Sequence, residues 1–254
     1  MRDLSLQRLA DEMMQAWVIA VKDVRVYYLT PPMIMFGLLL PFFLFFSFSV
    51  KRNIGADVGL ARLLALTTFF TASSAGPVII PMERRTGTYD RLLVAPMSLM
   101  TLLLGKSLVG AFFAVTVSVV PLSIGVIFLG VSVADVGLLA TGILFSSLAF
   151  SALGLVFASI PARSVGSIMM PSTLIRWPLL FISGIFIPLS DMASWARPFA
   201  FLSPLTYAQD LFNQAVLGRG FLPFWLDIVV LPLLFLIFIA PCVYFHRRSR
   251  ILGY

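Results

Sequence analysis

Residues 63–82 read LLALTTFFTASSAGPVIIPM, and this stretch decides the fold because 20 residues pass without a charge. An α-helix needs about 20 predominantly apolar residues to cross roughly 30 Å of hydrocarbon. The stretch ends at three consecutive charges, Glu83, Arg84 and Arg85. We therefore predict a membrane-spanning helix over residues 63–82, with its charged end at a membrane surface.

The rest of the chain repeats this pattern. Of its 254 residues, 60% are hydrophobic and 11% are charged, and the mean hydropathy is +1.02, whereas about one quarter of the residues of a soluble domain are charged. The sequence predicts an all-α, polytopic membrane protein in which residues 31–254 form one domain of six transmembrane helices. The expected spans are 31–50, 63–82, 107–130, 136–160, 167–189 and 226–246.

The basic residues indicate which side of the membrane each loop occupies. Twelve fall on the side that carries the termini, namely Arg2, Arg8, Lys22, Arg25, Arg84, Arg85, Arg91, Lys106, Arg163, Arg247, Arg248 and Arg250. Five fall on the opposite side, namely Lys51, Arg52, Arg62, Arg197 and Arg219. Because cytoplasmic loops carry the excess of Lys and Arg, we expect a plasma-membrane protein with both termini in the cytoplasm. The net charge of +7 then reflects topology, and we expect no nucleic-acid partner.

Residues 1–30 precede the first span and have the pattern of a cytoplasmic amphipathic helix. The apolar positions that recur every three or four residues are Leu9, Met13, Trp17, Val21, Val24 and Tyr28. The polar positions are Arg8, Asp11, Glu12, Gln15, Lys22 and Arg25. Such a helix either packs on the bundle or lies in the inner interface with Trp17 and Tyr28 at headgroup depth, and we expect the interface.

Catalytic and metal-binding patterns are missing from the sequence. A single cysteine, Cys242, and a single histidine, His246, supply neither a disulfide framework nor a set of metal ligands. No paired carboxylates and no Ser/His/Asp arrangement lie beside the spans, which argues against a lipid-modifying membrane enzyme. The acidic residues lie at or outside the span boundaries, which argues against the alternative of a self-contained six-span channel or secondary carrier.

Gly105-Lys106-Ser107 resembles the end of a phosphate-binding loop. That loop requires a glycine five positions before Gly105, where this chain has Met100. We therefore interpret Lys106 as a cation that marks the inner interface and expect no nucleotide and no other cofactor bound by this chain.

The segment 83–96, ERRTGTYDRLLVAP, joins the second and third spans on the cytoplasmic side. Gly87 permits a turn, Thr88 can cap a helix, and Pro96 ends it. Tyr89, Leu92 and Leu93 then share one helical face. Two interpretations stay open, an ordinary basic loop and a short amphipathic helix that fits a groove on a cytoplasmic partner.

Three motifs resemble the ABC-2 type transporter permeases, the membrane subunits of ATP-binding-cassette exporters, most closely those of the daunorubicin or drug-resistance type. The first is Glu83-Arg84-x-x-Gly87-Thr88 with the following leucines and Pro96. The second begins PLLFISGIFIP at 178–188 and continues to Trp195 and SPLTY at 203–207. The third, before the first span, is Trp17 with Lys22-Asp23-x-Arg25.

The resemblance implies two permeases, this chain and a second copy or a homologue, each coupled to a separate ABC ATPase subunit that carries the ATP. It implies alternating access for a hydrophobic drug-like or lipid-like substrate, although polysaccharide, lipid-precursor and sodium exporters share much of the pattern. ATPase coupling would fall to Glu83, Arg84, Arg85, Gly87, Thr88, Tyr89, Leu92, Leu93 and Pro96. The outer gate would include Pro178, Ser183, Gly184 and Pro188, and an outer re-entrant helical hairpin would carry Trp195, Pro204, Thr206 and Tyr207.

Arg176 is the only lysine or arginine inside the six expected spans. At about 1.5 Å per helical residue it lies roughly 20 Å from Arg163, at a depth where a charge is costly. It therefore lines the substrate path or joins two spans through carbonyls freed by Pro178, unless the span begins near Met169 and Arg176 lies less deep.

Overall fold

The computed structural model describes residues 2–27, 30–49, 54–95, 97–160 and 164–252, and these form helices without any strand. The elements follow in the order α1 (Arg2–Tyr27), α2 (Pro31–Ile34), the π-helix η1 (Met35–Leu39), α3 (Leu40–Ser49), α4 (Ala56–Thr86), α5 (Thr88–Val94), α6 (Leu99–Ser123), the π-helix η2 (Ile124–Phe128), α7 (Val136–Ala158), α8 (Val165–Ile182), α9 (Arg197–Ala200), α10 (Pro204–Leu217) and α11 (Phe224–Leu252).

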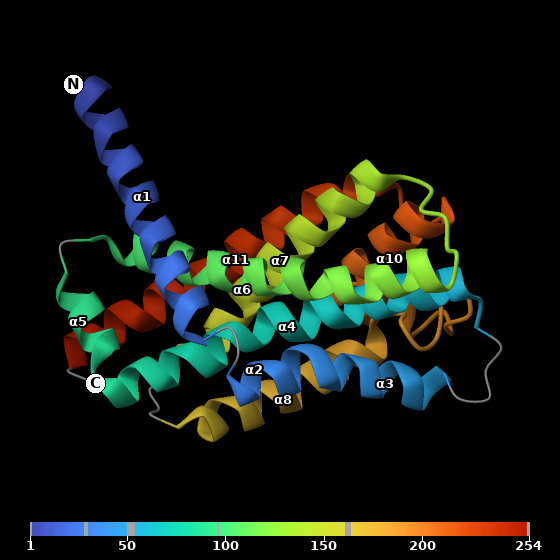
Figure 1. Cartoon of the computed structure of the whole chain (residues 1–254), viewed down its shortest axis with the longest axis horizontal. Helices are drawn as coiled ribbons and strands as arrows, with labels where there is room; N and C mark the ends of the chain where they lie inside the picture. The colour runs from blue at the N-terminus through green and yellow to red at the C-terminus, as the bar shows by residue number, and fades with distance from the viewer. Residues whose placement is uncertain (1, 28–29, 50–53, 96, 161–163, 253–254) are drawn as a thin grey trace.

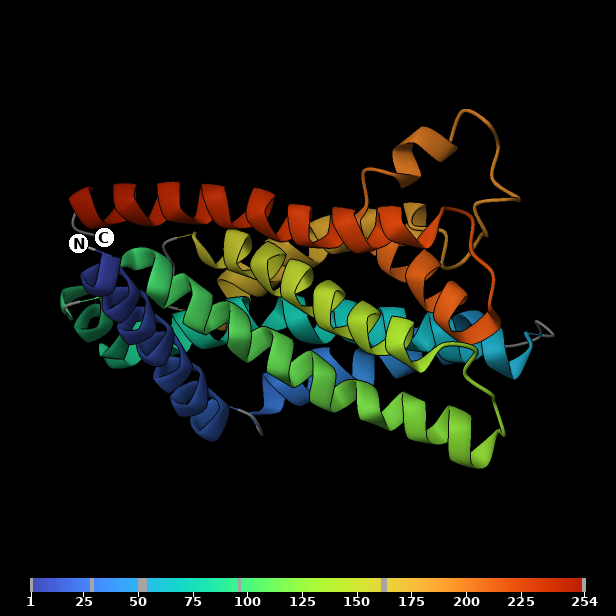
Figure 2. The ribbon, with the colours of Figure 1, turned by 90° about the horizontal axis from the view of Figure 1, so that it is seen from above.

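The expected all-α membrane fold is confirmed. Five helices are each long and apolar enough to span a bilayer, namely α4, α6 continued by η2, α7, α8 and α11. The chain has a sixth candidate span only if two helical segments that meet at 93°, Asp11–Tyr27 and Pro31–Ser47, are counted together as one broken span. The second of these segments comprises α2, η1 and most of α3 and lies within the predicted first span. Helix α1 and the C-terminal end of α11 lie at the same end of the bundle (Figure 2), the arrangement that six spans would give.

The fifth span is shorter than the sequence predicts. Helix α8 ends at Ile182 and not at residue 189. Gly184 takes a left-handed φ of 89°, a conformation that a residue with a side chain adopts only under strain. The segment that follows, 183–203, is irregular apart from the short α9.

Helix α4 is the centre of the bundle. Figure 1 shows it between α6 on one side and α3 and α8 on the other, and it also contacts α7 and α10. Every residue of its most apolar stretch is buried, whereas only 17% of the corresponding stretch of α11 is. The outer helices therefore present their apolar side chains to lipid, while α4 is enclosed by protein.

Small residues let α4 approach its neighbours closely, as is common between membrane helices. A Cβ added to Gly154 of α7 would lie 2.5 Å from the carbonyl oxygen of Ser73. A Cβ on Gly110 of α6 would lie 2.9 Å from the carbonyl oxygen of Ala72. The backbones of α6 and α7 thus lie against two consecutive residues of α4, Ala72 and Ser73.

The expected outer re-entrant hairpin is built from α9 and α10. Figure 2 shows the segment around α9 projecting from the end opposite the termini, after which α10 turns back beside α11. Most side chains of α10 are buried, and it contacts α4, α7 and α11. At about 1.5 Å per residue its 14 residues cover about 21 Å, too little to cross the bilayer.

We predict that Gly154→Ala lowers the stability of the fold. The added methyl meets a backbone carbonyl that cannot rotate away, and overpacking of this kind costs about 1–3 kcal/mol. The matched control is Gly166→Ala, at an exposed position of α8 where the nearest atom to a new Cβ is 3.8 Å away. Thermal unfolding in detergent should show a lower midpoint for Gly154→Ala alone, and equal midpoints for the two variants would contradict the close packing.

Candidate functional site

Four charged side chains meet where α1, α4 and α6 converge, and we name Lys22, Asp23, Glu83 and Lys106 the charge cluster. The Nζ of Lys106 lies 2.6 Å from Asp23 Oδ2 and 2.5 Å from Glu83 Oε2. The Nζ of Lys22 lies 2.8 Å from Asp23 Oδ1 and 2.5 Å from Glu83 Oε1. Each carboxylate therefore faces both ammonium groups, and the cluster has no net charge.

Burial makes the charge cluster a strong tie between the three helices. Asp23 and Glu83 are fully buried and Lys106 is 3% exposed. Taking one partner out of a buried ion pair costs about 3–5 kcal/mol, because the remaining charge stays in a medium that solvates it poorly. Two consecutive positions of α1 are thus fastened to the charged end of α4 and to α6.

The structure changes the interpretation of two of these residues. Lys106, which the sequence predicts to be a cation that marks the inner interface, is buried within the cluster and paired with two carboxylates. Glu83, which the family resemblance places among the ATPase-coupling residues, directs its carboxylate at Lys22 and Lys106. A partner protein has no access to a side chain that is fully buried.

The predicted cytoplasmic helix is α5. Gly87, at a left-handed φ of 71°, ends α4 and serves as the N-cap of α5. Thr88 is therefore the first residue of α5 and not its cap, and its hydroxyl lies 3.0 Å from that of Thr86. The turn allows α5 to fold back against the bundle.

The apolar face of α5 points toward its own chain. Tyr89 is 3% exposed, in a cluster with Ile80, Leu102 and Leu103, and Leu92 and Leu93 pack against that cluster. Burial raises the pKa of the Tyr89 phenol to about 12, although the nearby Arg84 lowers it, so the phenol stays neutral at physiological pH. Tyr89, Leu92 and Leu93 share one helical face, as the periodicity predicts, but this face packs on the bundle.

The opposite face of α5 is open. Val94 is 81% exposed, and three charged residues, Arg85, Asp90 and Arg91, are exposed with it. These four residues are the outward face of the segment 83–95. Pro96 lies outside the described residues.

Arg84 joins this segment to the end of α7. Its Nη1 donates to the carbonyl oxygen of Ile160 at 2.6 Å, and its guanidinium carbon lies 5.1 Å from the centre of the Tyr89 ring. A cation held over an aromatic face is favourable. Arg84 thus braces α5 against two helices.

Helix α1 has one face on the bundle and one face away from it. Ala16, Ile19 and Ala20 are buried, and a Cβ on Gly105 of α6 would lie 2.9 Å from the carbonyl oxygen of Ala16. Two of the predicted apolar positions, Met13 and Trp17, are 74% and 60% exposed. Helix α1 therefore packs on the bundle, while its opposite face stays exposed and can lie in the expected membrane interface. Tyr28 lies outside the described residues.

Arg176 is fully buried between α4, α7 and α8. Its Nη1 donates to Ser74 Oγ at 2.9 Å, and its Nη2 donates to the carbonyl oxygen of Ser73 at 3.1 Å and to Ser172 Oγ at 2.9 Å. Its guanidinium carbon lies 5.8 Å from the centre of the Phe157 ring. Arg176 joins two spans, as one of the two expected roles requires, while its role in a substrate path stays a prediction.

The carbonyl that Arg176 binds is freed by a different proline from the one expected. In an α-helix the carbonyl of Ser73 would accept from the N–H of residue 77, which is Pro77 and has no N–H. The arginine on α8 therefore fills a gap in the backbone hydrogen bonding of α4. Pro178 lies two residues beyond Arg176 and plays no part in this contact.

The predicted gate and hairpin residues gather at the opposite end of the bundle. Three of the gate residues, Ser183, Gly184 and Pro188, line a cavity of about 370 Å³ together with Thr206 of α10. Pro178 is exposed on α8 and does not line it. The cavity also contains residues that sequence reasoning missed, namely Val58, Arg62, Leu189, Ser190, Gln209, Asp210, Asn213, Leu217, Arg219, Gly220 and Phe221.

Hydrogen bonds fold the hairpin back onto α8 and around this cavity. Ser203 Oγ donates to the carbonyl oxygen of Leu179 at 2.8 Å. Thr206 Oγ1 donates to the carbonyl oxygen of Ala200 at 2.5 Å, and the Tyr207 hydroxyl to that of Phe201 at 3.0 Å. Pro204 is a buried first residue of α10, whereas Trp195 is 76% exposed. Among the cavity residues that were not predicted, Gln209 and Asn213 carry a recognisable sequence signal, since they are two polar residues one helical turn apart in an apolar chain.

A comparison with protein families matches residues 14–217 to the model described as ABC-2 type transporter. The matched range includes the charge cluster, α5, Arg176 and the gate and hairpin residues. No curated protein matches the chain.

We predict that Lys106→Met destabilises the fold by about 3–5 kcal/mol, because it leaves two buried carboxylates to one partly exposed lysine. Thermal unfolding measures this, and the double variant Glu83→Gln/Lys106→Met should recover part of the loss. Arg85→Met removes an exposed charge from the same end of α4 and should change the midpoint little. If Lys106→Met and Arg85→Met unfold at the same midpoint temperature, the charge cluster does not hold the three helices together.

We predict that Arg176 and Pro77 are energetically coupled. Pro77→Ala supplies the N–H that fills the carbonyl of Ser73, so Arg176→Met should cost less stability in the Pro77→Ala background than in the original chain. An unsatisfied buried carbonyl costs about 1–3 kcal/mol, which sets the expected coupling in a double-mutant cycle of unfolding free energies. Additive effects would exclude this contact as the reason for the arginine.

Proposed function

This chain belongs to the ABC-2 type transporter family, and we propose that it is the membrane-spanning permease of an ATP-driven exporter. A second permease, a copy or a homologue, completes the translocation path, and separate ATPase subunits bind the ATP. The complex lies in the plasma membrane with both termini in the cytoplasm, which the excess of basic residues on that side supports. The substrate is a hydrophobic drug-like or lipid-like compound.

The observation that carries this proposal is the open face of α5. Helix α5, braced by Arg84 and by its own apolar residues, presents Asp90, Arg91 and the apolar Val94 outward, and the exposed Arg85 lies just before it in the last turn of α4. An exposed apolar residue on the same helix as charges of both signs suits a groove on a cytoplasmic ATPase. Tyr89, Leu92 and Leu93 position α5, and the contacts to the ATPase come from the exposed residues.

The charge cluster supplies the mechanical connection from α5 into the membrane. Because it holds α1, α4 and α6 together through buried ion pairs, a displacement of α5 moves these helices as one body. Helix α4 has 31 residues and is about 46 Å long. It therefore reaches from the ATPase side to the outer cavity, where Val58 and Arg62 lie.

The outer end is the place where such a movement opens a gate. Helix α8 stops at Ile182, Gly184 takes its left-handed turn, and Pro188 removes another backbone donor. A segment without regular backbone hydrogen bonds rearranges more easily than a helix. ATP binding shifts the equilibrium between an inward-open and an outward-open arrangement, and hydrolysis resets it.

We predict that Val94→Asp abolishes ATP-dependent export while the protein still reaches the membrane. The side chain is exposed, so the fold tolerates the change, but the carboxylate would be buried unpaired against the ATPase. Co-purification of the ATPase subunit and its stimulation should fall at least about tenfold. Val136→Asp makes the same change at a 69% exposed position at the far end of the bundle and should leave both unchanged. Normal coupling in Val94→Asp would refute the docking face.

A further inference from the structure

The outer cavity is formed by this chain alone. It lies within one chain, between the start of α4, the segment after α8, and α10 with the loop that follows. Its volume of about 370 Å³ falls within the range of small-molecule sites. From the chemistry of its lining we propose that it binds a small hydroxylated organic anion of the sugar-phosphate or polyol-phosphate type.

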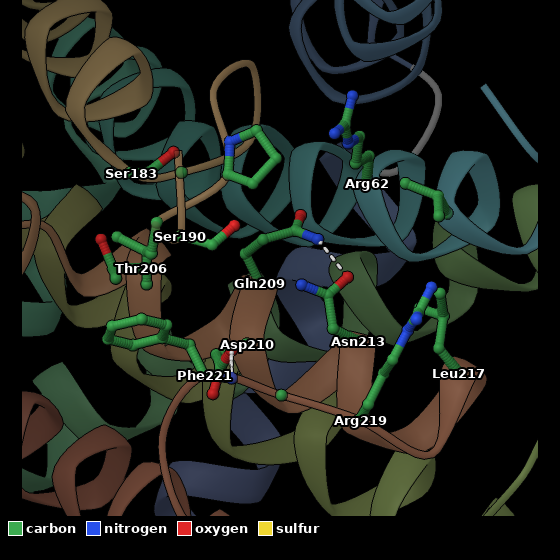
Figure 3. A pocket seen from close by; sticks show the side chains of 15 residues that line it. Arg62, Ser183, Ser190, Thr206, Gln209, Asp210, Asn213, Leu217, Arg219 and Phe221 are labelled. Carbon is green, nitrogen blue, oxygen red and sulfur yellow. Dashed lines mark hydrogen bonds between the residues drawn. The ribbon is translucent and has the colours of Figure 1, made fainter. Parts of the chain in front are cut away.

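Gln209 has a buried side-chain oxygen that can accept a hydrogen bond from a ligand. Its side chain is 96% buried, since only 4% is exposed, and it lines the middle of the cavity in Figure 3. Its Nε2 donates to Asn213 Oδ1 at 2.9 Å, whereas its Oε1 has no partner among the described residues. A buried acceptor without a partner is costly and unusual, and a ligand hydroxyl group satisfies it.

Arg219 makes the cavity attractive to an anion. It lies in the loop after α10 and lines the cavity beside Asn213 in Figure 3, and Arg62 of α4 also belongs to the lining. No carboxylate of the described residues forms an ion pair with Arg219. The planar guanidinium group binds phosphate through two parallel hydrogen bonds, so a phosphate ester fits this side of the cavity.

The one acidic residue of the cavity is already occupied. The carboxylate of Asp210 accepts from the backbone N–H of Phe221 at 2.7 Å and of Leu222 at 2.8 Å. It also accepts from Gln214 Nε2 at 3.0 Å. These three donors disperse its charge and hold the loop that carries Arg219, so that Asp210 shapes the site and Arg219 sets its preference for anions.

The same chemistry occurs in a free phosphate ester and in a hydroxylated phospholipid headgroup at the membrane surface. Binding to either source requires neither ATP nor the ATPase subunit. The inference therefore does not depend on the proposed export mechanism, and a failure of ATP coupling leaves it standing. Since Ser183, Gly184 and Pro188 line the same cavity, an occupied site would also link the ligand to the gate segment.

The experiment uses the full chain in nanodiscs of phosphatidylcholine and isothermal titration calorimetry without ATP. The probes are glucose 6-phosphate and, as the uncharged match, glucose. A parallel set of nanodiscs containing phosphatidylinositol tests the headgroup source by competition with glucose 6-phosphate and by the amount of lipid retained on purification. The variants are Arg219→Gln and Gln209→Leu, with Arg91→Gln as the same charge removal at the opposite end of the bundle.

Saturable binding of glucose 6-phosphate and not of glucose, weakened at least about tenfold by Arg219→Gln but not by Arg91→Gln, supports the site. Retention of phosphatidylinositol that Arg219→Gln abolishes supports it with the headgroup as the source. Because Arg219 is exposed, its variant keeps the fold even if Gln209→Leu does not. Absence of both binding and lipid retention, or binding that Arg219→Gln leaves unchanged, overturns the proposal.

Discussion

A helix enclosed by protein inside a membrane must find a partner for every charge and every free carbonyl without help from water, and α4 is such a helix. Two of its buried hydroxyl groups donate to backbone carbonyls, Thr68 to that of Leu64 in the same helix and Thr71 to that of Gly37 in η1. Its proline-freed carbonyl at Ser73 is met by Arg176, and its terminal carboxylate at Glu83 by two lysines. Helices α1, α6 and α8 supply these partners, because a buried charge or carbonyl without a hydrogen-bond partner is costly in the membrane.

This constraint also places the two proposed functional ends on one long helix. At one end, α4 passes through the left-handed Gly87 into α5, whose apolar face packs on the bundle and whose charged face is open. At the other end, Val58 and Arg62 of the same helix form part of the cavity beside the gate segment. In the proposed mechanism, movement at the cytoplasmic surface reaches the outer cavity through this one helix, whose most apolar stretch is buried at every residue.

Sequence reasoning succeeded where the signal is local and repeated. Runs with almost no charge located the five helices that are long and apolar enough to span a bilayer, since lipid excludes charge over the whole thickness of its hydrocarbon. It was less successful wherever a residue's role depends on what lies opposite. Tyr89, Leu92 and Leu93 do share a face, but periodicity cannot tell an apolar face that meets a partner from one that meets its own core. Lys106 and Glu83 likewise read as interface charges because their pairing joins positions 23 residues apart.

The sequence by itself determined the membrane, the helical class, the side on which the termini are expected and the family resemblance, because hydropathy and charge act at each position independently of folding. Only the tertiary structure decided that Arg176 fills the gap left by Pro77, that four charges from three helices neutralise one another, and that Gln209 leaves an oxygen unsatisfied in the outer cavity. Such contacts join residues far apart in the chain. Their free-energy contributions depend on burial, and burial arises only once the helices have packed.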